Sequence, residues 1–117
     1  MSAPYPLYYY HGVLKRAVDG DTVVVHLDLG LRVYTEVSLR IAGINAPEVF
    51  RGTTEERQAG IAARDYMARH EGRDVVLHTY KDAQSFNRYV ADVYLGDTQE
   101  NLGDLMVMAG HAVRVTA

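Results

Sequence analysis

Three separated polar segments of this sequence contain the side chains best suited to chemistry. They are residues 19–22 (Asp-Gly-Asp-Thr), residues 40–48 and residues 86–88 (Phe-Asn-Arg). Together they supply acidic groups and an amide oxygen for a hard cation, a further carboxylate to activate water, and two guanidinium groups. A phosphoryl-transfer transition state needs positive charge at its equatorial oxygens and an oriented nucleophile. The ordered set of segments therefore favours hydrolysis of a phosphodiester, although no single segment does so alone.

The composition limits the class of protein. The chain has 117 residues, 48% of them hydrophobic and 23% charged, which predicts one globular domain over residues 1–117. Cysteine is absent, so disulfides and thiolate metal sites are excluded. The formal net charge of -3 argues against a protein that holds nucleic acid by bulk electrostatics. An enzyme that acts on nucleic acid through a locally positive cleft remains compatible with this charge.

No segment has the pattern of a leader or a membrane span. Residues 1–10 contain no basic stretch followed by an apolar core, and no run approaches the ~20 apolar residues of a span. We therefore expect a cytoplasmic protein without a membrane partner. The histidines show no metal-ligand spacing, so zinc is not expected. They are His11, His26, His70, His78 and His111.

The hydrophobic pattern predicts five strands and two helices. The strands are expected at residues 7–18, 22–29, 32–42, 73–80 and 88–95, and the helices from Thr53 or Thr54 to about His70 and at residues 102–108. In the third strand the period of two puts Arg40 on the face opposite the apolar residues. The apolar stripe of the first helix is expected at Ala59, Ala62, Ala63, Tyr66 and Met67.

This order of elements predicts an OB-fold in the α+β class. An OB-fold is a five-stranded, partly open Greek-key barrel, and its surface often binds oligonucleotides. The longer helix would lie between strands three and four, and the short helix would follow strand five.

Over residues 15–113 the chain resembles the staphylococcal nuclease (thermonuclease) family. Residues 19–22 resemble the family's metal-binding turn. Residues 40–48 resemble its segment with an arginine, a metal-ligand position and a Pro-Glu pair. Residues 86–88, followed by Tyr-Val-Ala, resemble its aromatic-Gly-Arg segment, and residues 101–112 resemble its closing helix.

The resemblance implies a calcium site in which three residues bind the ion. Asp21 would bind it through its carboxylate, Asn45 through its amide oxygen and Ala46 through its backbone carbonyl. The family usually has aspartate in place of Asn45 and threonine in place of Ala46. Loss of one negative charge at Asn45 predicts weaker calcium binding, and magnesium or manganese could replace calcium at such a site. Asp19 and Thr22 would support the turn without binding the ion.

The resemblance also implies three catalytic residues. Glu48 would orient or deprotonate the attacking water, and Arg40 and Arg88 would bind the scissile phosphate. Two fixed N–H groups of a guanidinium can meet two phosphoryl oxygens, which a lysine cannot match. The implied protein is a calcium-dependent nuclease that acts on single-stranded or frayed DNA, with RNA as a further candidate substrate. We expect it to be a monomer.

Other interpretations of these residues stay open at this stage. Asp-Gly is a common turn dipeptide, Arg40 could pair with Glu36 on an exposed strand face, and Glu48 could cap the loop after the proline. Arg88 could lie in an exposed turn, and the tyrosines at 8–10 are more typical of sheet packing than of base stacking. A catalytically weak or inactive OB-fold module that binds nucleic acid is the alternative function. A protein-interaction scaffold is a third, supported only by the acidic net charge.

Overall fold

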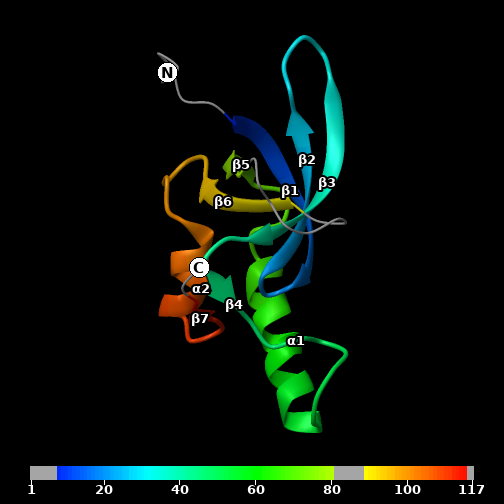
Figure 1. Cartoon of the computed structure of the whole chain (residues 1–117), viewed down its shortest axis with the longest axis vertical. Coiled ribbons are helices and arrows are strands. Elements are labelled where there is room, and N and C mark those ends of the chain that lie inside the picture. Colours follow the sequence, from blue (N-terminus) through cyan, green and yellow to red (C-terminus); the bar gives the residue numbers. More distant parts are fainter. Residues whose placement is uncertain (1–7, 81–88, 116–117) are drawn as a thin grey trace.

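The computed structural model describes residues 8–80 and 89–115. Seven strands and two helices follow one another in the described chain (Figure 1). They are β1 (Tyr9–Asp19), β2 (Thr22–Asp28), β3 (Tyr34–Ile41), β4 (Ile44–Asn45), α1 (Thr54–Ala68), β5 (Asp74–Thr79), β6 (Tyr89–Leu95), α2 (Leu102–Met108) and β7 (Val113–Arg114).

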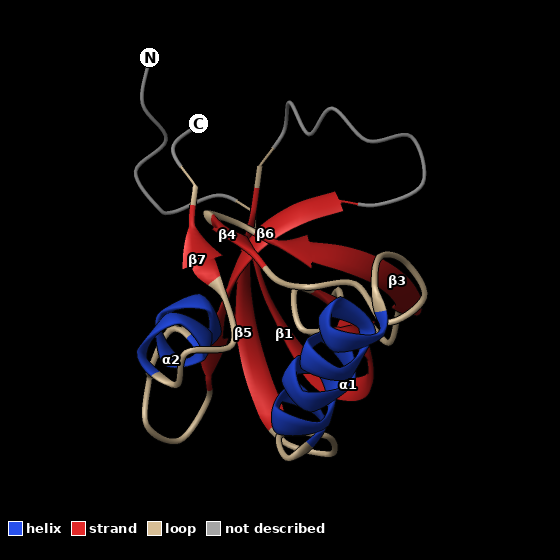
Figure 2. Ribbon diagram, turned by 90° about the horizontal axis from the view of Figure 1, so that it is seen from below, coloured by secondary structure: helices blue, strands red, loops and turns tan. Residues whose placement is uncertain are grey.

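Five of the strands form a closed barrel in the order β1-β2-β3-β6-β5. Its pairs are antiparallel except β3–β6, which runs parallel and aligns Arg40 with Val90. Both helices pack at one end of the barrel, and the β2–β3 hairpin projects from the other end (Figures 1 and 2). The predicted OB-fold and the position of α1 between the third and fourth barrel strands are confirmed.

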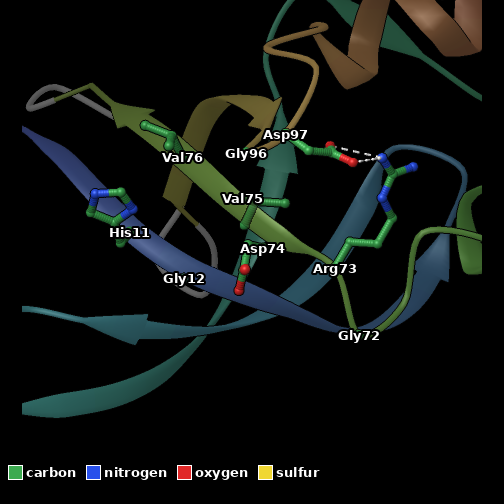
Figure 3. A pocket seen from close by; sticks show the side chains of 9 residues that line it. All are labelled: His11, Gly12, Gly72, Arg73, Asp74, Val75, Val76, Gly96 and Asp97. Atoms are coloured by element: carbon green, nitrogen blue, oxygen red, sulfur yellow. Dashed lines mark hydrogen bonds and ion pairs between the residues drawn. The ribbon is translucent and has the colours of Figure 1, made fainter.

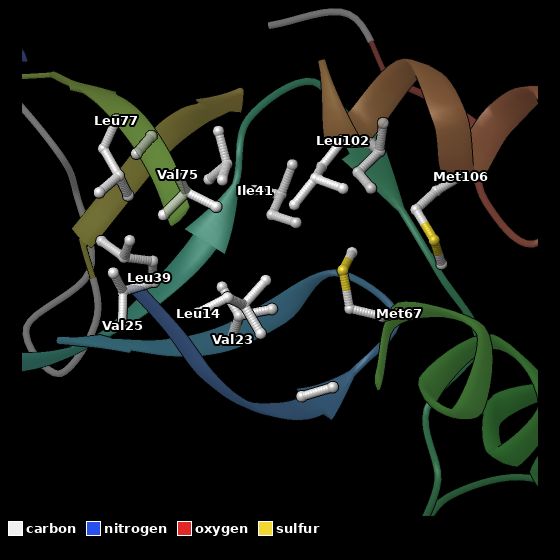
Figure 4. Close-up of a cluster of buried hydrophobic side chains, with 14 of the residues drawn as sticks. Leu14, Val23, Val25, Leu39, Ile41, Met67, Val75, Leu77, Leu102 and Met106 are labelled. Atoms are coloured by element: carbon white, nitrogen blue, oxygen red, sulfur yellow. The ribbon is translucent and has the colours of Figure 1, made fainter. Parts of the chain in front are cut away.

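The core consists of the inward residues of the barrel and the side chains with which the helices close it (Figure 4). Met67 of α1 and Leu102 and Met106 of α2 are fully buried at this closed end. The fully buried barrel residues include Leu14, Val23, Val25, Leu39, Ile41, Val75 and Leu77. Each buried aliphatic side chain contributes roughly 1.5–3 kcal/mol. The strands that carry the candidate site therefore rest on a packed frame.

The predicted apolar stripe of α1 is partly wrong. Ala59 and Ala62 are exposed, whereas Gly60, Ala63 and Met67 are the buried residues of this helix. Gly60 faces the loop that carries Glu48, and its lack of a side chain allows the backbone of that loop to pass close to the helix. A Cβ atom at Gly60 would lie only 2.2 Å from the carbonyl oxygen of Glu48. Thr53 caps the helix as expected, since its side chain accepts a hydrogen bond from the Glu56 amide.

The third predicted strand begins too early, because residues 32 and 33 lie in the turn before β3. Val33 is 51% exposed, and Thr35 is exposed as well. The hairpin extends past the barrel at this point (Figure 1), and Thr35 lines an open pocket together with Tyr10 of β1 and Tyr89 of β6. The short strands β4 and β7, which pair with each other, were not predicted. Across the described residues, no helix has both the length and the apolar character needed to cross a membrane.

Candidate functional site

The Asp21 carboxylate lies in the turn immediately before β2 and accepts hydrogen bonds from three donors. Its Oδ2 atom accepts hydrogen bonds from the Ala46 amide at 3.0 Å and from Arg40 Nη1 at 3.1 Å. Its Oδ1 atom accepts one from the Thr22 hydroxyl at 3.1 Å. Only 5% of Asp21 is exposed. A buried carboxylate needs such partners, because an unpaired charge away from water is costly.

Close packing around Gly20 places the turn that carries Asp21. A Cβ atom at Gly20 would lie 2.8 Å from the Ala63 Cβ and 2.9 Å from the Ala46 Cβ. The turn is thus pressed between α1 and the chain that follows β4, and neither neighbour has room to be larger. Ala46 is itself buried, so a small residue there suits the contact between the two segments.

The Arg40 guanidinium joins the turn to the chain around β4. While Nη1 donates to Asp21, Nη2 donates to the Ile44 carbonyl at 3.1 Å and to Asn45 Oδ1 at 3.3 Å. Arg40 pairs in register with Thr22 across β2 and β3, which fixes its backbone beside the turn. Its side chain remains 30% exposed. Four of the residues selected from the sequence therefore meet here: Asp21, Arg40, Asn45 and Ala46.

Glu48 lies on the same loop but in a different environment. Its side chain is 56% exposed and its carboxylate is 3.4 Å from Nε of Arg51 rather than beside Arg40. It borders an open pocket of about 510 Å³. The loop backbone is nevertheless fixed, because it packs on Gly60 and because the Val49 amide donates to Asp19 Oδ1 at 3.4 Å. Phe86, Asn87 and Arg88 lie outside the described residues, so their expected positions are not tested.

The oxygen atoms around Arg40 are of the kind that a hard cation prefers as ligands. The Asp21 carboxylate, the Asn45 amide oxygen and the Ile44 carbonyl all converge on its guanidinium. Calcium and magnesium bind through oxygen ligands of these types. Within the described chain no group of three or more His, Cys, Asp or Glu could hold a metal. A metal at this site would therefore depend on one carboxylate and on neutral oxygens.

Sequence reasoning missed three residues that shape this region. The Ile44 carbonyl gives no signal in the sequence, because every residue has one. Arg51 neighbours Glu48 and could have been noticed from its spacing of three residues. Gly60 could have been found, because a glycine inside a helix often marks a close approach of another backbone.

A separate groove lies along β1 and β5 and is lined by other residues (Figure 3). Arg73 donates from Nη2 to both carboxylate oxygens of Asp97, at 2.9 and 3.0 Å. This hydrogen bonding lowers the pKa of Asp97 below its usual value. The nearby His70 also has a lowered pKa, first because of burial and then because of the positive charges of Arg73 and Arg69. The arginine and carboxylate of this groove already satisfy each other, so it is a weaker candidate for chemistry.

The sequence of this chain matches a known protein family and two curated proteins. A family model described as staphylococcal nuclease homologue matches residues 38–117. Thermonuclease of Staphylococcus hyicus is 33% identical over 89 residues, which cover 74% of this chain and 49% of that protein. Thermonuclease of Staphylococcus intermedius is 27% identical over 92 residues, which cover 77% of this chain and 52% of that protein. The chain thus spans about half the length of these curated relatives.

Proposed function

Because this chain belongs to the staphylococcal nuclease family, we propose that it hydrolyses phosphodiester bonds in single-stranded or frayed DNA, and in RNA, with calcium. The observation that carries the proposal is the position of Arg40. Its guanidinium is fixed by the buried Asp21 at one nitrogen and remains partly exposed to solvent. We further propose that residues 1–117 act as one domain and as a monomer.

In this proposal Asp21, Asn45 and the Ala46 carbonyl hold the metal. When bound there, a divalent ion would supply Lewis acidity to a phosphate oxygen and to a neighbouring water. Magnesium and manganese are the other candidates, since they also take oxygen ligands. Asp19 and Thr22 support the turn, and the hydrogen bond from Thr22 to Asp21 is consistent with that part.

Arg40 provides an oriented donor for the scissile phosphate. Its Nη1 atom donates to a charged partner, whereas its Nη2 atom donates to two neutral oxygens among the described residues. A phosphate oxygen is a stronger acceptor than either, because it carries negative charge that attracts the guanidinium in addition to accepting the hydrogen bond. Substrate can therefore replace the Nη2 partners while the Asp21 contact keeps the guanidinium in place.

Glu48 is proposed to take the proton of the attacking water, and Arg88 to supply the second guanidinium. The exposed carboxylate of Glu48 can turn toward a water without breaking a buried contact. The assignment of Arg88 rests on the sequence resemblance alone. Two guanidinium groups would offset the negative charge that builds up on the phosphoryl oxygens.

One observation favours a second candidate function, a module that binds nucleic acid without cutting it. Asn45 is neutral and already accepts a hydrogen bond from Arg40. A weak metal site would leave the arginine able to bind phosphate while the water lacks activation. This alternative predicts binding that is independent of calcium.

A cleavage assay distinguishes the two functions. The purified chain is incubated with single-stranded DNA, duplex DNA and RNA, each with millimolar calcium or with chelator. Calcium-dependent cutting that is lost in both Glu48→Gln and Arg88→Ala supports the nuclease. Binding without cutting supports the module. If the protein neither binds nor cuts any of the three, both functions are wrong and a scaffold role is favoured.

A further inference from the structure

A row of ring side chains lies on the outer face of β1 and β5, apart from the Asp21 turn. We call Tyr9, His78 and Tyr80 the aromatic strip. The rings of Tyr9 and His78 stack with their centroids 4.3 Å apart and their planes 3° from parallel. The His78 and Tyr80 rings are 5.2 Å apart. Tyr9 and Tyr80 are 47% and 42% exposed, so much of their surface faces solvent rather than the core.

Asp92 of β6 fixes the orientation of the strip. The Tyr80 hydroxyl donates a hydrogen bond to Asp92 Oδ2, and Nδ1 of His78 is 3.9 Å from the same oxygen. The hydrogen bond to Asp92 is the main cause that raises the pKa of Tyr80 to about 12. Tyr80 therefore keeps its proton at neutral pH and remains a donor. Rings that are held in place before binding lose little conformational entropy when a ligand stacks on them.

The strip begins close to the proposed phosphate site. Arg40 of β3 pairs in register with Val90 of β6, and the Val90 carbonyl accepts a hydrogen bond from the Tyr80 amide at 3.2 Å. Two strand spacings of about 4.8 Å place the Cα atoms of Arg40 and Tyr80 about 10 Å apart. Ile41 and Ala91, which follow Arg40 and Val90, are buried. Side chains alternate along a strand, so Arg40 and Val90 share the outer face with the strip.

We propose that the aromatic strip is a stacking subsite for unpaired bases of a nucleic-acid strand whose phosphate is bound at Arg40. This inference rests on the proposed function and specifies its substrate as single-stranded. Every base has a flat π-face, and aromatic side chains of OB-folds bind single strands by stacking. Bases in a duplex already stack on each other, so an exposed ring gains little from them.

The charges around the strip determine which part of the strand it contacts. Asp92 contributes a negative charge beside His78 and Tyr80, which repels phosphates. The phosphates therefore stay at Arg40 while the bases lie on the rings. The strip and Arg40 together fit within the about 4–16 nucleotides that one OB-fold engages.

A binding experiment with matched oligonucleotides tests this subsite. Dissociation constants are measured by fluorescence anisotropy, in chelator to prevent cutting, for a single-stranded oligothymidine and for an abasic strand of equal length. Tyr9→Ala should weaken binding of oligothymidine about fivefold or more, the usual loss for one stacked base, and leave the abasic strand unchanged. Tyr9→Trp should restore binding, which separates stacking from any loss of folding.

Tyr34→Ala is the matched control. Tyr34 is 56% exposed and stacks on His26 with centroids 5.5 Å apart, so it is also a half-exposed tyrosine paired with a histidine. It lies at the far end of the β2–β3 hairpin, six residues from Arg40 along β3, or roughly 20 Å. Its loss should change neither dissociation constant.

The outcomes separate this inference from the nuclease proposal. If the wild type cuts DNA but Tyr9→Ala weakens both oligonucleotides equally, or neither, the subsite is wrong and the nuclease stands. If the wild type binds neither oligonucleotide, or binds both equally well, the subsite is likewise wrong. If binding depends on bases and on Tyr9 but no substrate is cut with calcium, the subsite stands and the nuclease proposal fails.

Discussion

Asp21 and Glu48 are the two acidic side chains at the centre of the proposed chemistry, and they differ in burial and in hydrogen bonding. The Asp21 side chain is 7% exposed and accepts hydrogen bonds from three donors. The Glu48 side chain is 56% exposed and neighbours only an exposed arginine among its described ion pairs. The Asp21 carboxylate is therefore held inside the folded structure, whereas the Glu48 carboxylate lies at the surface, where it can change its partner.

This difference separates two demands that an active site makes on its protein. A group that positions an arginine must not move, and burial with full hydrogen bonding prevents movement. A group that accepts a proton from water must reach solvent and change its partner during the reaction. The contrast predicts that substitutions around Asp21 will change both stability and activity, whereas substitutions of Glu48 will change activity alone.

Arg40→Met and Glu48→Gln test this contrast with the largest expected effects. Arg40→Met should lower the cleavage rate by about 10²–10³, the usual loss when a donor to the transition state is removed. It should also lower the free energy of unfolding by about 1–3 kcal/mol, because Asp21 loses a charged partner while buried. Glu48→Gln should lower the rate by about 10²–10⁴ with stability changed by less than about 0.5 kcal/mol. Single-turnover kinetics and urea unfolding measure the two quantities.

Arg51→Ala serves as the control, because Arg51 is 84% exposed and pairs only with the Glu48 carboxylate among its described contacts. Its loss should be small in both measurements. Should Glu48→Gln destabilise the protein as much as Arg40→Met does, the two carboxylates do not differ in the way described.

Gly60→Ala tests whether the close contact between α1 and the loop that carries Glu48 holds this loop in place. In an ordinary helix this change stabilises by up to about 1 kcal/mol. Here the new methyl group would lie 2.2 Å from the Glu48 carbonyl oxygen and 2.9 Å from the Val49 amide nitrogen, so the loop must shift. We expect a loss of about 1–3 kcal/mol in the free energy of unfolding, and a lower cleavage rate. Gln58→Ala, at an exposed position of the same helix, is the control, and a stabilising Gly60→Ala would refute the contact.

The barrel was predictable because alternation along a strand reveals which side chains face inward. The pattern of β3 correctly put Leu39 and Ile41 inside and Arg40 outside. Alternation does not reveal where a strand begins, which is why the expected third strand started two residues before β3. A two-residue strand such as β4 is too short to show a period. The stripe of α1 was partly misplaced because alanines are compatible with either face of a helix.

The meeting of distant side chains was less predictable than the elements that carry them. The resemblance of the sequence to the nuclease family singled out Asp21, Arg40, Asn45 and Ala46, and the fold brings them into contact, while their chemical roles remain predictions. The contact of Arg40 with the Ile44 carbonyl depends on a loop conformation that no pattern encodes. Stacking of Tyr9 on His78 depends on the register of β1 with β5, which sequence patterns do not determine.

Asn45→Asp extends the comparison by adding a second carboxylate near Asp21 and Arg40. The new charge would lie near Arg40 Nη2, where the Asn45 oxygen now accepts. One more negative ligand should lower the calcium concentration for half-maximal rate by about tenfold, which corresponds to about 1.4 kcal/mol. Asn45→Ala should raise it. If Asn45→Asp requires more calcium than the wild type, Asn45 is not a metal ligand.

The smallest effect is expected at Asp97, which combines a feature of Asp21 with a feature of Glu48. Its side chain is 68% exposed, as Glu48 is exposed, yet Arg73 binds it through both carboxylate oxygens. The arginine lowers the pKa of Asp97 in the folded protein below its ordinary value of 3.8, so the stabilising effect is present above that pH and is lost as the pH falls through the lowered pKa. Asp97→Asn should therefore make the thermal midpoint fall less steeply below about pH 4. An unchanged slope would mean that a bidentate contact without burial does not stabilise this fold, and that burial is what distinguishes Asp21.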